Sequence, residues 1–387
     1  HPNECTEEEY KEFYRKVFMD YKEPLFWIHL NMDYPFNLKG ILYFPKINME
    51  YESIEGTIKL YNNQVFIADN IKEVIPEFLM LLKGVIDCPD LPLNVSRSAL
   101  QNDGFVKKIS DYITKKVADK LTGMCKTDRE TYEKYWDDIA PFIKFGCLKD
   151  QKFAEKMDDY IIYKNLDGKY LTLKDCMDKA KEEGHENQIY YVTNEKEQSQ
   201  YINMFKANGQ DAIIMSHSID NPFISQEEQK HENLKFLRID ADVNDTLCEE
   251  VKEEDKEALK KQEETLTETF KKALGDDKLQ VKVEKLKDAE ISSMITLSEE
   301  TRRMQDMMKM YNMGMDASMF GGSGQVLVLN ANNKLVQYVL EHTDGENTPK
   351  ICEQLYDLAQ LSHGSLTSER MTKFIARSNE IMGMMLN

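Results

Sequence analysis

Apolar positions at the start of the chain recur at helical spacing. Thr6 can cap the first turn, and Glu9 stands three residues on, so each side chain can accept a hydrogen bond from the other's backbone. Four apolar side chains share one face of the expected helix: Tyr10, Phe13, Tyr14 and Val17. The pattern predicts a helix that begins directly after Thr6.

Shorter apolar runs separated by turn residues come next. Residues 57–61 and 64–68 flank Asn62-Asn63, and they predict a hairpin because Asn tolerates positive φ in a tight turn. Two stretches have helical spacing: 71–85, apart from Pro76, and 106–121. Together these segments predict a mixed α/β unit.

Alternation of helix and strand resumes after a helical connector at 127–149. The expected elements run in the order helix, strand, helix, strand, strand: 171–183, 189–193, 195–207, 211–216 and 236–241. Strand, helix, strand at this spacing is typical of a parallel sheet, because parallel strands need a crossover connection. We therefore expect a second, smaller α/β unit.

The last third of the chain begins with a charged stretch, 245–274, which keeps a helical apolar stripe and meets Gly275 at its expected end. Strands at 279–283 and 326–329 come after it, and then helices at 333–342, 348–361 and 368–386. The expected fold class is multidomain, α/β followed by α+β. The predicted division is an α/β unit at 1–122, a helical connector at 123–150, a smaller α/β unit at 151–243 and a C-terminal α+β domain at 244–387.

Charge and cysteine spacing narrow the class of protein. The 387 residues carry 50 Lys and Arg against 69 Asp and Glu, a formal net charge of −19. A surface this acidic repels phosphate backbones, and no apolar run is long enough to span a membrane, so we expect neither nucleic-acid nor membrane partners. No two of the seven cysteines are closer than 22 positions, and no leader sequence is visible. We expect a cytoplasmic protein, with most of its thiols in the core.

Motifs for metal and nucleotide binding are incomplete. His185-Glu186 and His231-Glu232 each begin an HExxH zinc motif, but both lack the second His. The glycine-rich segment 321–324 precedes a strand and lacks the Lys of a phosphate loop. No metal site is predicted, and the chain alone is not expected to bind a nucleotide. Because it starts at His1 rather than Met, we expect a piece of something longer.

Residues 90–101 read Asp-Leu-Pro-Leu-Asn-Val-Ser-Arg-Ser-Ala-Leu-Gln. Pro92 favours an extended approach, and Asn94 or Ser96 can cap a helical turn that begins after it. Arg97 then lies on a loop or a first helical turn, where its planar guanidinium is suited to grip a phosphate. A surface Arg paired with an acid is the alternative that spacing alone leaves open.

Methionine is concentrated at residues 304–319, which hold seven of the chain's 21. Four side chains in this stretch share one helical face: Met304, Met308, Tyr311 and Met315. Flexible, polarisable Met suits a surface that must accept many partners. Ordinary core or dimer packing is the alternative.

The sequence Asp-Leu-Pro-Leu-Asn-Val-Ser-Arg at 90–97 resembles a signature of the ninety-kilodalton heat-shock protein family. Residues 6–14 resemble the start of that family's middle domain in its bacterial, high-temperature protein G form, and so do 24–27, 84–87 and Tyr135-Trp136. The resemblance extends more loosely to the C terminus. It implies a middle domain of two αβα units joined by a helical connector, followed by an α+β C-terminal dimerisation domain.

The resemblance also implies an ATP-driven chaperone whose ATP pocket belongs to an N-terminal domain that this sequence lacks. It assigns Arg97 to the γ-phosphate, with Gln101 nearby and Asn94 bracing the loop. Family members commonly have Glu after this Arg, where this chain has Ser98. The full-length protein is expected to be an ATPase that uses ATP and magnesium, whereas the chain alone should hold no cofactor and be inactive.

Unfolded or partly folded client proteins and a second copy of the chain are the partners that the resemblance implies. The client-contacting residues that it favours are Met304, Met307, Met308, Tyr311 and Met315. Trp27 and Phe223 are further candidates, with core packing favoured for Trp27. The last helices are assigned to a two-fold bundle that makes a homodimer. Its expected interface residues are Leu355, Leu358, Leu361, Phe374, Ile381 and Met385.

The chain ends Met-Met-Leu-Asn and lacks the Met-Glu-Glu-Val-Asp tail of eukaryotic cytosolic members, so tetratricopeptide co-chaperones are not expected partners. Two other classes of protein remain as alternatives. The transducer domain of a DNA topoisomerase or mismatch-repair ATPase also reaches a γ-phosphate, but such domains typically use Lys and need a basic, DNA-facing surface. The net charge of −19 and Arg97 both oppose that alternative. The second alternative is a dimeric scaffold with no link to ATP.

Overall fold

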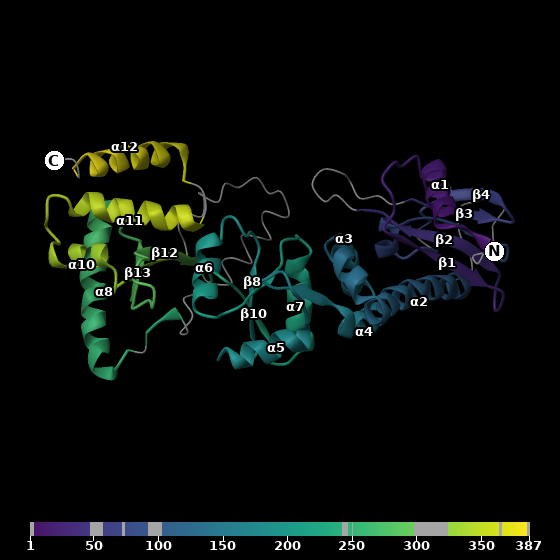
Figure 1. The fold of residues 1–387 in the computed structure, drawn as a ribbon, viewed down its shortest axis with the longest axis horizontal. Helices are drawn as coiled ribbons and strands as arrows, with labels where there is room; N and C mark the ends of the chain where they lie inside the picture. The colour runs from purple at the N-terminus through teal and green to yellow at the C-terminus, as the bar shows by residue number, and fades with distance from the viewer. Residues whose placement is uncertain are drawn as a thin grey trace. The chain divides into compact units, whose positions relative to one another are not determined.

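The computed structural model describes residues 4–46, 57–71, 74–91, 103–241, 247–249, 251–297, 324–363 and 366–384. The chain separates into two compact units, His1–Ile162 and Tyr163–Asn387, and each is described by itself. Both units combine helices with small sheets, so the fold is mixed α/β (Figure 1). The finer four-part division at 122, 150 and 243 stays a prediction.

The first unit is built on a five-stranded sheet. Its strands are β1 (Phe26–Met32), β2 (Leu38–Phe44), β3 (Ile58–Asn62), β4 (Val65–Asp69) and β5 (Lys83–Asp87), in the order β1-β2-β5-β3-β4. Only β3 and β5 pair in parallel. The remaining elements are helices: α1 (Glu7–Phe18), the 3₁₀ helix η2 (Glu77–Leu81), α2 (Asp103–Thr127), α3 (Arg129–Lys149), α4 (Gln151–Met157) and the 3₁₀ helix η3 (Asp158–Tyr160). Helix α1 starts at the predicted capping box of Thr6 and Glu9, and the predicted connector helix is α3.

Two expectations for this unit need correction. The stretch 71–85 is not one helix: only Glu77–Leu81 are helical among its described residues, as η2, and its end belongs to β5, which pairs with β2 on one side and β3 on the other. The predicted hairpin forms, but its turn lies one residue later. Asn63 and Gln64 have φ of 49° and 66°, so the left-handed turn residues are Asn-Gln rather than Asn-Asn.

The second unit contains the expected parallel sheet. Its strands are β8 (Gln188–Val192), β9 (Ile213–Ile214) and β10 (Lys235–Arg238), in the order β10-β8-β9, and all neighbours are parallel. Helices α5 (Leu173–Glu182), α6 (Ser199–Ala207) and α7 (Asp220–Lys230) accompany these strands. The sequence did not predict α7, nor the pair β6 (Ile162–Lys164) and β7 (Tyr170–Thr172).

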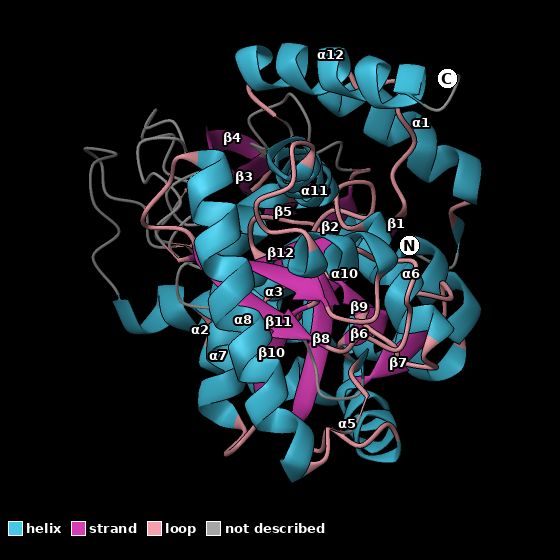
Figure 2. Ribbon diagram, turned by 90° about the vertical axis from the view of Figure 1, so that its left-hand side faces the viewer, coloured by secondary structure: helices cyan, strands magenta, loops and turns pink. Residues whose placement is uncertain are grey.

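In the described part of residues 251–384, a mixed sheet and four helices follow. Strands β11 (Gln280–Glu284), β12 (Ser293–Leu297) and β13 (Gln325–Asn330) run in the order β11-β13-β12, and β12 was not predicted. Helix α8 (Glu253–Leu274) ends at Gly275, whose φ of 65° is the left-handed conformation that Gly adopts at low cost. The other helices are α10 (Lys334–Glu341), α11 (Thr348–His363) and α12 (Ser368–Met384). Helix α11 contacts both β12 and α8 (Figure 2).

The two sheets of the second unit share one apolar core. Tyr190 and Val192 of β8 belong to the same buried cluster as Met294 of β12 and Val328 of β13. The hydroxyl of Tyr201 in α6 donates a hydrogen bond to the backbone carbonyl of Ile295 at 2.6 Å. Residues before and after 243 are therefore joined by side-chain packing as well as by the chain.

Five of the seven thiols are buried, as expected: Cys88, Cys125, Cys147, Cys176 and Cys352. Among the described helices, none combines the length and the apolar content that a membrane crossing requires.

Candidate functional site

The predicted phosphate-binding residues Asn94, Arg97 and Gln101 lie outside the described residues. The structure does describe both flanks of that segment. Strand β5 ends at Asp87 and leads to Leu91, which is buried. Helix α2 begins at Asp103 on the other side, and its Val106 is buried. The segment 92–102 therefore starts and ends at fixed parts of the first unit.

Asn62, at the end of β3, holds the chain that leaves β5. Its Nδ2 donates to the carbonyl oxygens of Cys88 and Pro89 at 3.1 Å each, and lies 3.3 Å from that of Leu91. The backbone N–H of Cys88 donates to the carbonyl of Tyr61 at 3.0 Å, which extends the β3–β5 pairing by one bond. The turn after β3 therefore fixes the backbone up to the last described residue before Pro92.

The turn between β1 and β2 contacts both flanks. The backbone N–H and the side-chain amide of Asn37 donate to the same carboxylate oxygen of Asp90, at 2.7 and 3.2 Å. The adjacent Phe36 is buried, and its ring lies edge-on to Phe105 of α2, with centroids 5.4 Å apart. Two consecutive residues thus connect the entry and the exit of segment 92–102.

Most of the predicted client-contacting residues also lie outside the described residues: Met304, Met307, Met308, Tyr311 and Met315. Phe223 of α7 is fully buried, so its ring has no surface to offer a partner in this structure. Trp27 of β1 is half-buried and stacks on Tyr10 with ring centroids 4.7 Å apart. The rings of Phe223 and Trp27 therefore both pack against the protein's own residues in this structure.

The residues predicted to form the dimer interface differ in how far they are exposed in the single chain. Leu355 is 1% exposed and belongs to the core around Leu266 and Phe270 of α8. Leu358 is 41% exposed. Leu361, Phe374 and Ile381 are half-buried, and Met385 lies outside the described residues.

Helix α12 is held to α11 mainly by polar contacts. Arg377 is its one buried side chain, whereas Ile375 and Met382 are 53% and 56% exposed. Arg370 and Arg377 both bind the fully buried carboxylate of Asp357 in α11. Three large apolar side chains of α12, Ile375, Met382 and Met384, are thus left on the surface of the single chain.

A cavity of about 280 Å³ opens beside this cluster and is lined by Leu274, Glu353, Asp357, Thr367, Glu369, Arg370, Lys373 and Arg377. Its three basic side chains are already matched by acids. Both arginines bind Asp357, and Lys373 pairs with Glu369 at 2.8 Å. The cavity therefore has no uncompensated cation with which to attract an anion.

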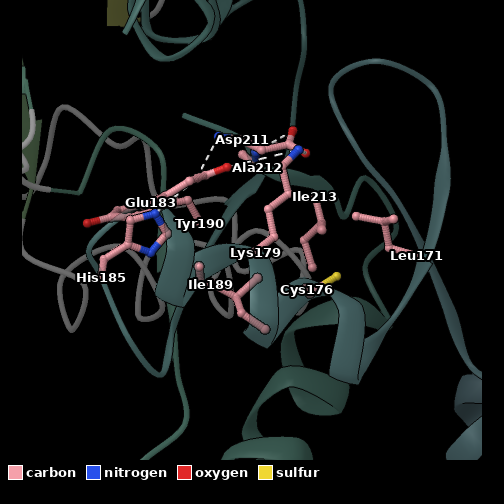
Figure 3. A pocket seen from close by; sticks show the side chains of 11 residues that line it. Leu171, Cys176, Lys179, Glu183, His185, Ile189, Tyr190, Asp211, Ala212 and Ile213 are labelled. Atoms are coloured by element: carbon pink, nitrogen blue, oxygen red, sulfur yellow. Dashed lines mark hydrogen bonds and ion pairs between the residues drawn. The ribbon is translucent and has the colours of Figure 1, made fainter. Parts of the chain in front are cut away.

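A second polar cluster joins the end of α5 to the start of β9 (Figure 3). Lys179 binds the carboxylate of Asp211, whose backbone N–H donates to Glu183 at 3.0 Å. The ring nitrogens of His185 face Glu183 at 3.1 Å and the carbonyl of Gln188 at 2.8 Å. The adjoining cavity, about 20 Å³, has room for roughly one water. We interpret the cluster as structural.

Both ring nitrogens of His185 face acceptors, an arrangement that favours the protonated ring because each nitrogen can then donate a hydrogen bond. Burial is the largest single influence and lowers the pKa of His185. The hydrogen bonds to the Glu183 carboxylate and the Gln188 carbonyl together outweigh it, so the net pKa is raised. The buried imidazolium is thereby paired with a carboxylate.

Comparison with known proteins defines the class. The model of the Hsp90 protein family matches residues 1–387, so the chain belongs to the Hsp90 family, a family of chaperones.

Its relatives include proteins named chaperone protein HtpG. That of Bacteroides thetaiotaomicron is 41% identical over 361 residues, which cover 90% of this chain and 52% of that protein. That of Porphyromonas gingivalis is 38% identical over 373 residues, 93% of this chain and 54% of that protein. That of Desulfitobacterium hafniense is 28% identical over 395 residues, 98% of this chain and 62% of that protein. The chain spans about half the length of its more similar curated relatives.

The sequence alone did not identify Asn37, Asn62 and Asp90 as residues that hold the flanks. Asn62 was interpreted only as a turn residue, and Asp90 only as part of a motif. Their contacts join positions 26 to 53 residues apart, which local spacing does not reveal.

Proposed function

We propose that this chain is the client-binding and dimerising part of an ATP-dependent chaperone. The observation that carries the proposal is the family match over residues 1–387, together with relatives that are named as chaperones. The same match disfavours a topoisomerase or mismatch-repair transducer and a scaffold with no link to ATP. The proposed setting is the cytoplasm, and the proposed partners are unfolded or partly folded proteins and a second copy of the chain.

The ATP and the magnesium belong, in this proposal, to an N-terminal domain of the full-length protein. This chain contributes Arg97 to the γ-phosphate, with Gln101 and Asn94 supporting it. A positioned guanidinium stabilises charge on the transferring phosphoryl group. Such arginines raise the turnover rate by about a thousandfold or more. We expect a smaller effect here, because Arg97 has to reach the ATP from a separate domain.

Two experiments test this division of roles. Calorimetric titration of the isolated chain with Mg-ATP should show no saturable binding. In the full-length protein, Arg97→Ala should slow ATP turnover and leave nucleotide affinity nearly unchanged, since the interaction acts mainly on the chemical step. Micromolar binding to the isolated chain, or unaltered turnover in the variant, would contradict the proposal.

The exposed apolar side chains of α12 support the dimerisation part. A helix that docks on its own chain through charged groups, while leaving Ile375 and Met382 in water, is suited to bury that face against a second copy. We propose that α11 and α12 form a helical bundle with their symmetry mates. Leu358, Leu361, Phe374, Ile381 and Met385 remain the proposed contacts, whereas Leu355 lies beneath them in the core.

A further inference from the structure

The two flanks of segment 92–102 are held by side-chain amides from two turns. Asn62, at the turn between β3 and β4, donates to the carbonyls of Cys88 and Pro89 and approaches that of Leu91. Asn37, at the turn between β1 and β2, binds the carboxylate of Asp90 with both its backbone and its side-chain N–H. All four residues from 88 to 91 therefore have a backbone or side-chain group within hydrogen-bonding distance of one of these two asparagines.

These contacts exceed what a turn needs for its own stability. A second asparagine of the β3–β4 turn, Asn63, donates its side chain only locally, to Oδ1 of Asn62. Asn37 is exposed and Asn62 is half-buried, so neither fills the apolar core. Their amides instead fix a backbone that has left the sheet.

We propose that Asn37 and Asn62, here called the clamp, are positioning residues for the segment 92–102, which carries Arg97. The inference rests on the proposed role of Arg97. A guanidinium that must meet a phosphate on another domain depends on the direction in which the chain leaves β5, and a misplacement of about 1 Å can cost roughly a hundredfold in rate. The carbonyls bound by Asn62 and the Asp90 carboxylate bound by Asn37 fix residues 88–91, from which that segment starts.

The neighbouring Phe36 extends the argument to the other flank. Its buried ring packs against Phe105, two residues into α2 from Asp103. Asn37 on the entry side and Phe36 on the exit side are consecutive. The β1–β2 turn thus contacts the described residues on both sides of segment 92–102.

The test uses the full-length protein and the variants Asn37→Ala and Asn62→Ala. Each should lower kcat for ATP about tenfold and change KM less than about twofold, because the loss falls on the step in which Arg97 acts. The matched control is Gln64→Gly in the same turn. Residue 64 has a φ of 66°, which Gly adopts freely, and its exposed side chain takes no part in the hydrogen bonds of Asn37 or Asn62, so turnover should stay at the wild-type rate.

Combination with Arg97→Ala separates the possible outcomes. If the clamp acts through Arg97, the double variant Asn62→Ala Arg97→Ala should be no slower than Arg97→Ala alone. A further loss of about tenfold in the double variant would show that the clamp acts elsewhere and would overturn the inference. Both clamp variants could instead turn over ATP at the wild-type rate while Arg97→Ala is slow. That result would overturn the positioning role of Asn37 and Asn62 and leave the role of Arg97 intact.

Wild-type turnover in Arg97→Ala itself would sink the proposed function first. Melting curves show whether a slow variant is slow only because its fold is destabilised. Asn37→Ala changes only an exposed side chain, so it should melt with the wild type even if Asn62→Ala does not. A slow Asn37→Ala with an unchanged melting temperature supports positioning, and a normal rate in that variant counts against it.

Discussion

The carboxylate of Asp357 accepts a hydrogen bond from Nη1 of Arg377 at 2.9 Å, and both side chains are almost wholly removed from water. Arg370 binds the other oxygen of the same carboxylate, and its guanidinium lies 4.4 Å from the ring centre of Tyr356. One acid on α11 therefore holds two bases on α12. Since Arg377 is the one buried side chain of α12, the position of this helix on α11 depends on the charge cluster.

Asp357→Ala should therefore lower the free energy of unfolding by about 3 kcal/mol, because it takes a fully buried carboxylate from the buried Arg377 and leaves Glu353, at 2.8 Å, as its remaining acidic partner. We take the lower end of the usual range, since Arg370 is partly solvated and can relax into water. Urea denaturation measures the change. The control is Asp344→Ala, which breaks the fully surface-exposed pair with Lys272 and should cost less than about 1 kcal/mol. Equal effects of the two substitutions would show that the buried cluster is not special.

The double substitution Ile375→Glu, Met382→Glu should turn the dimer into a monomer. Both side chains are exposed in the single chain, so charges there cost its own fold little, but they would be buried at the proposed interface. Light scattering should give about 90 kDa for the wild type, twice 45.2 kDa, and about half of that for the variant. The control is Leu335→Glu on α10, which is also exposed and should leave the dimer intact. A variant that stays dimeric would place the interface elsewhere.

His185 should make stability depend on pH. Its pKa is raised in the folded chain, so the folded state holds the proton more tightly than the unfolded state does. The resulting stabilisation is fully present below the unfolded pKa of about 6.5 and is lost as pH rises through the folded pKa. The difference in unfolding free energy between the wild type and His185→Ala should therefore be larger at about pH 6 than at about pH 9.

Glu183→Gln serves as the control for this titration. It removes the carboxylate that favours the imidazolium, so the pKa of His185 should fall and the extra stability at low pH should shrink. Nuclear magnetic resonance of the His185 ring follows the titration directly. A midpoint at or below about 6.5 in the wild type would contradict the assignment of a protonated ring.

Replacing Met304, Met308 and Tyr311 with Ser should weaken the suppression of client aggregation and change the melting temperature little. The reason is chemical: unbranched Met re-packs against different partners at low strain, which suits a surface that serves many clients. A buried Met typically costs about 2–5 kcal/mol when truncated to Ala, so three core residues would visibly unfold the protein. A large fall in melting temperature, or loss of the dimer, would identify these side chains as core.

Local signals predicted much of this fold. The capping box of Thr6 and Glu9, the stop at Gly275 and the parallel pairing of β8, β9 and β10 all depend on short-range sequence features, and all three appear in the structure. The helix predicted over residues 71–85 was wrong for a physical reason. Gly84 lies in a strand paired on both sides with segments far away in the sequence, and such pairing overrides local helical spacing.

The candidate site shows the same limit. A motif could single out Arg97, but the asparagines that hold the chain just before it, at residues 88–91, look like ordinary turn residues in sequence. Helical stripes likewise grouped Leu355 with Leu358, although the first is fully buried and the second 41% exposed. A stripe indicates which face is apolar, and only packing decides which of its members remain available to a partner.

The core that joins the parallel sheet to the C-terminal sheet has a mechanical consequence. Tyr201 bonds across it to Ile295, and Val192 and Val328 lie in one continuous apolar cluster. A displacement of β12 or β13 is therefore transmitted to β8 through packed side chains as well as along the backbone, so the parallel sheet and the C-terminal sheet are mechanically coupled.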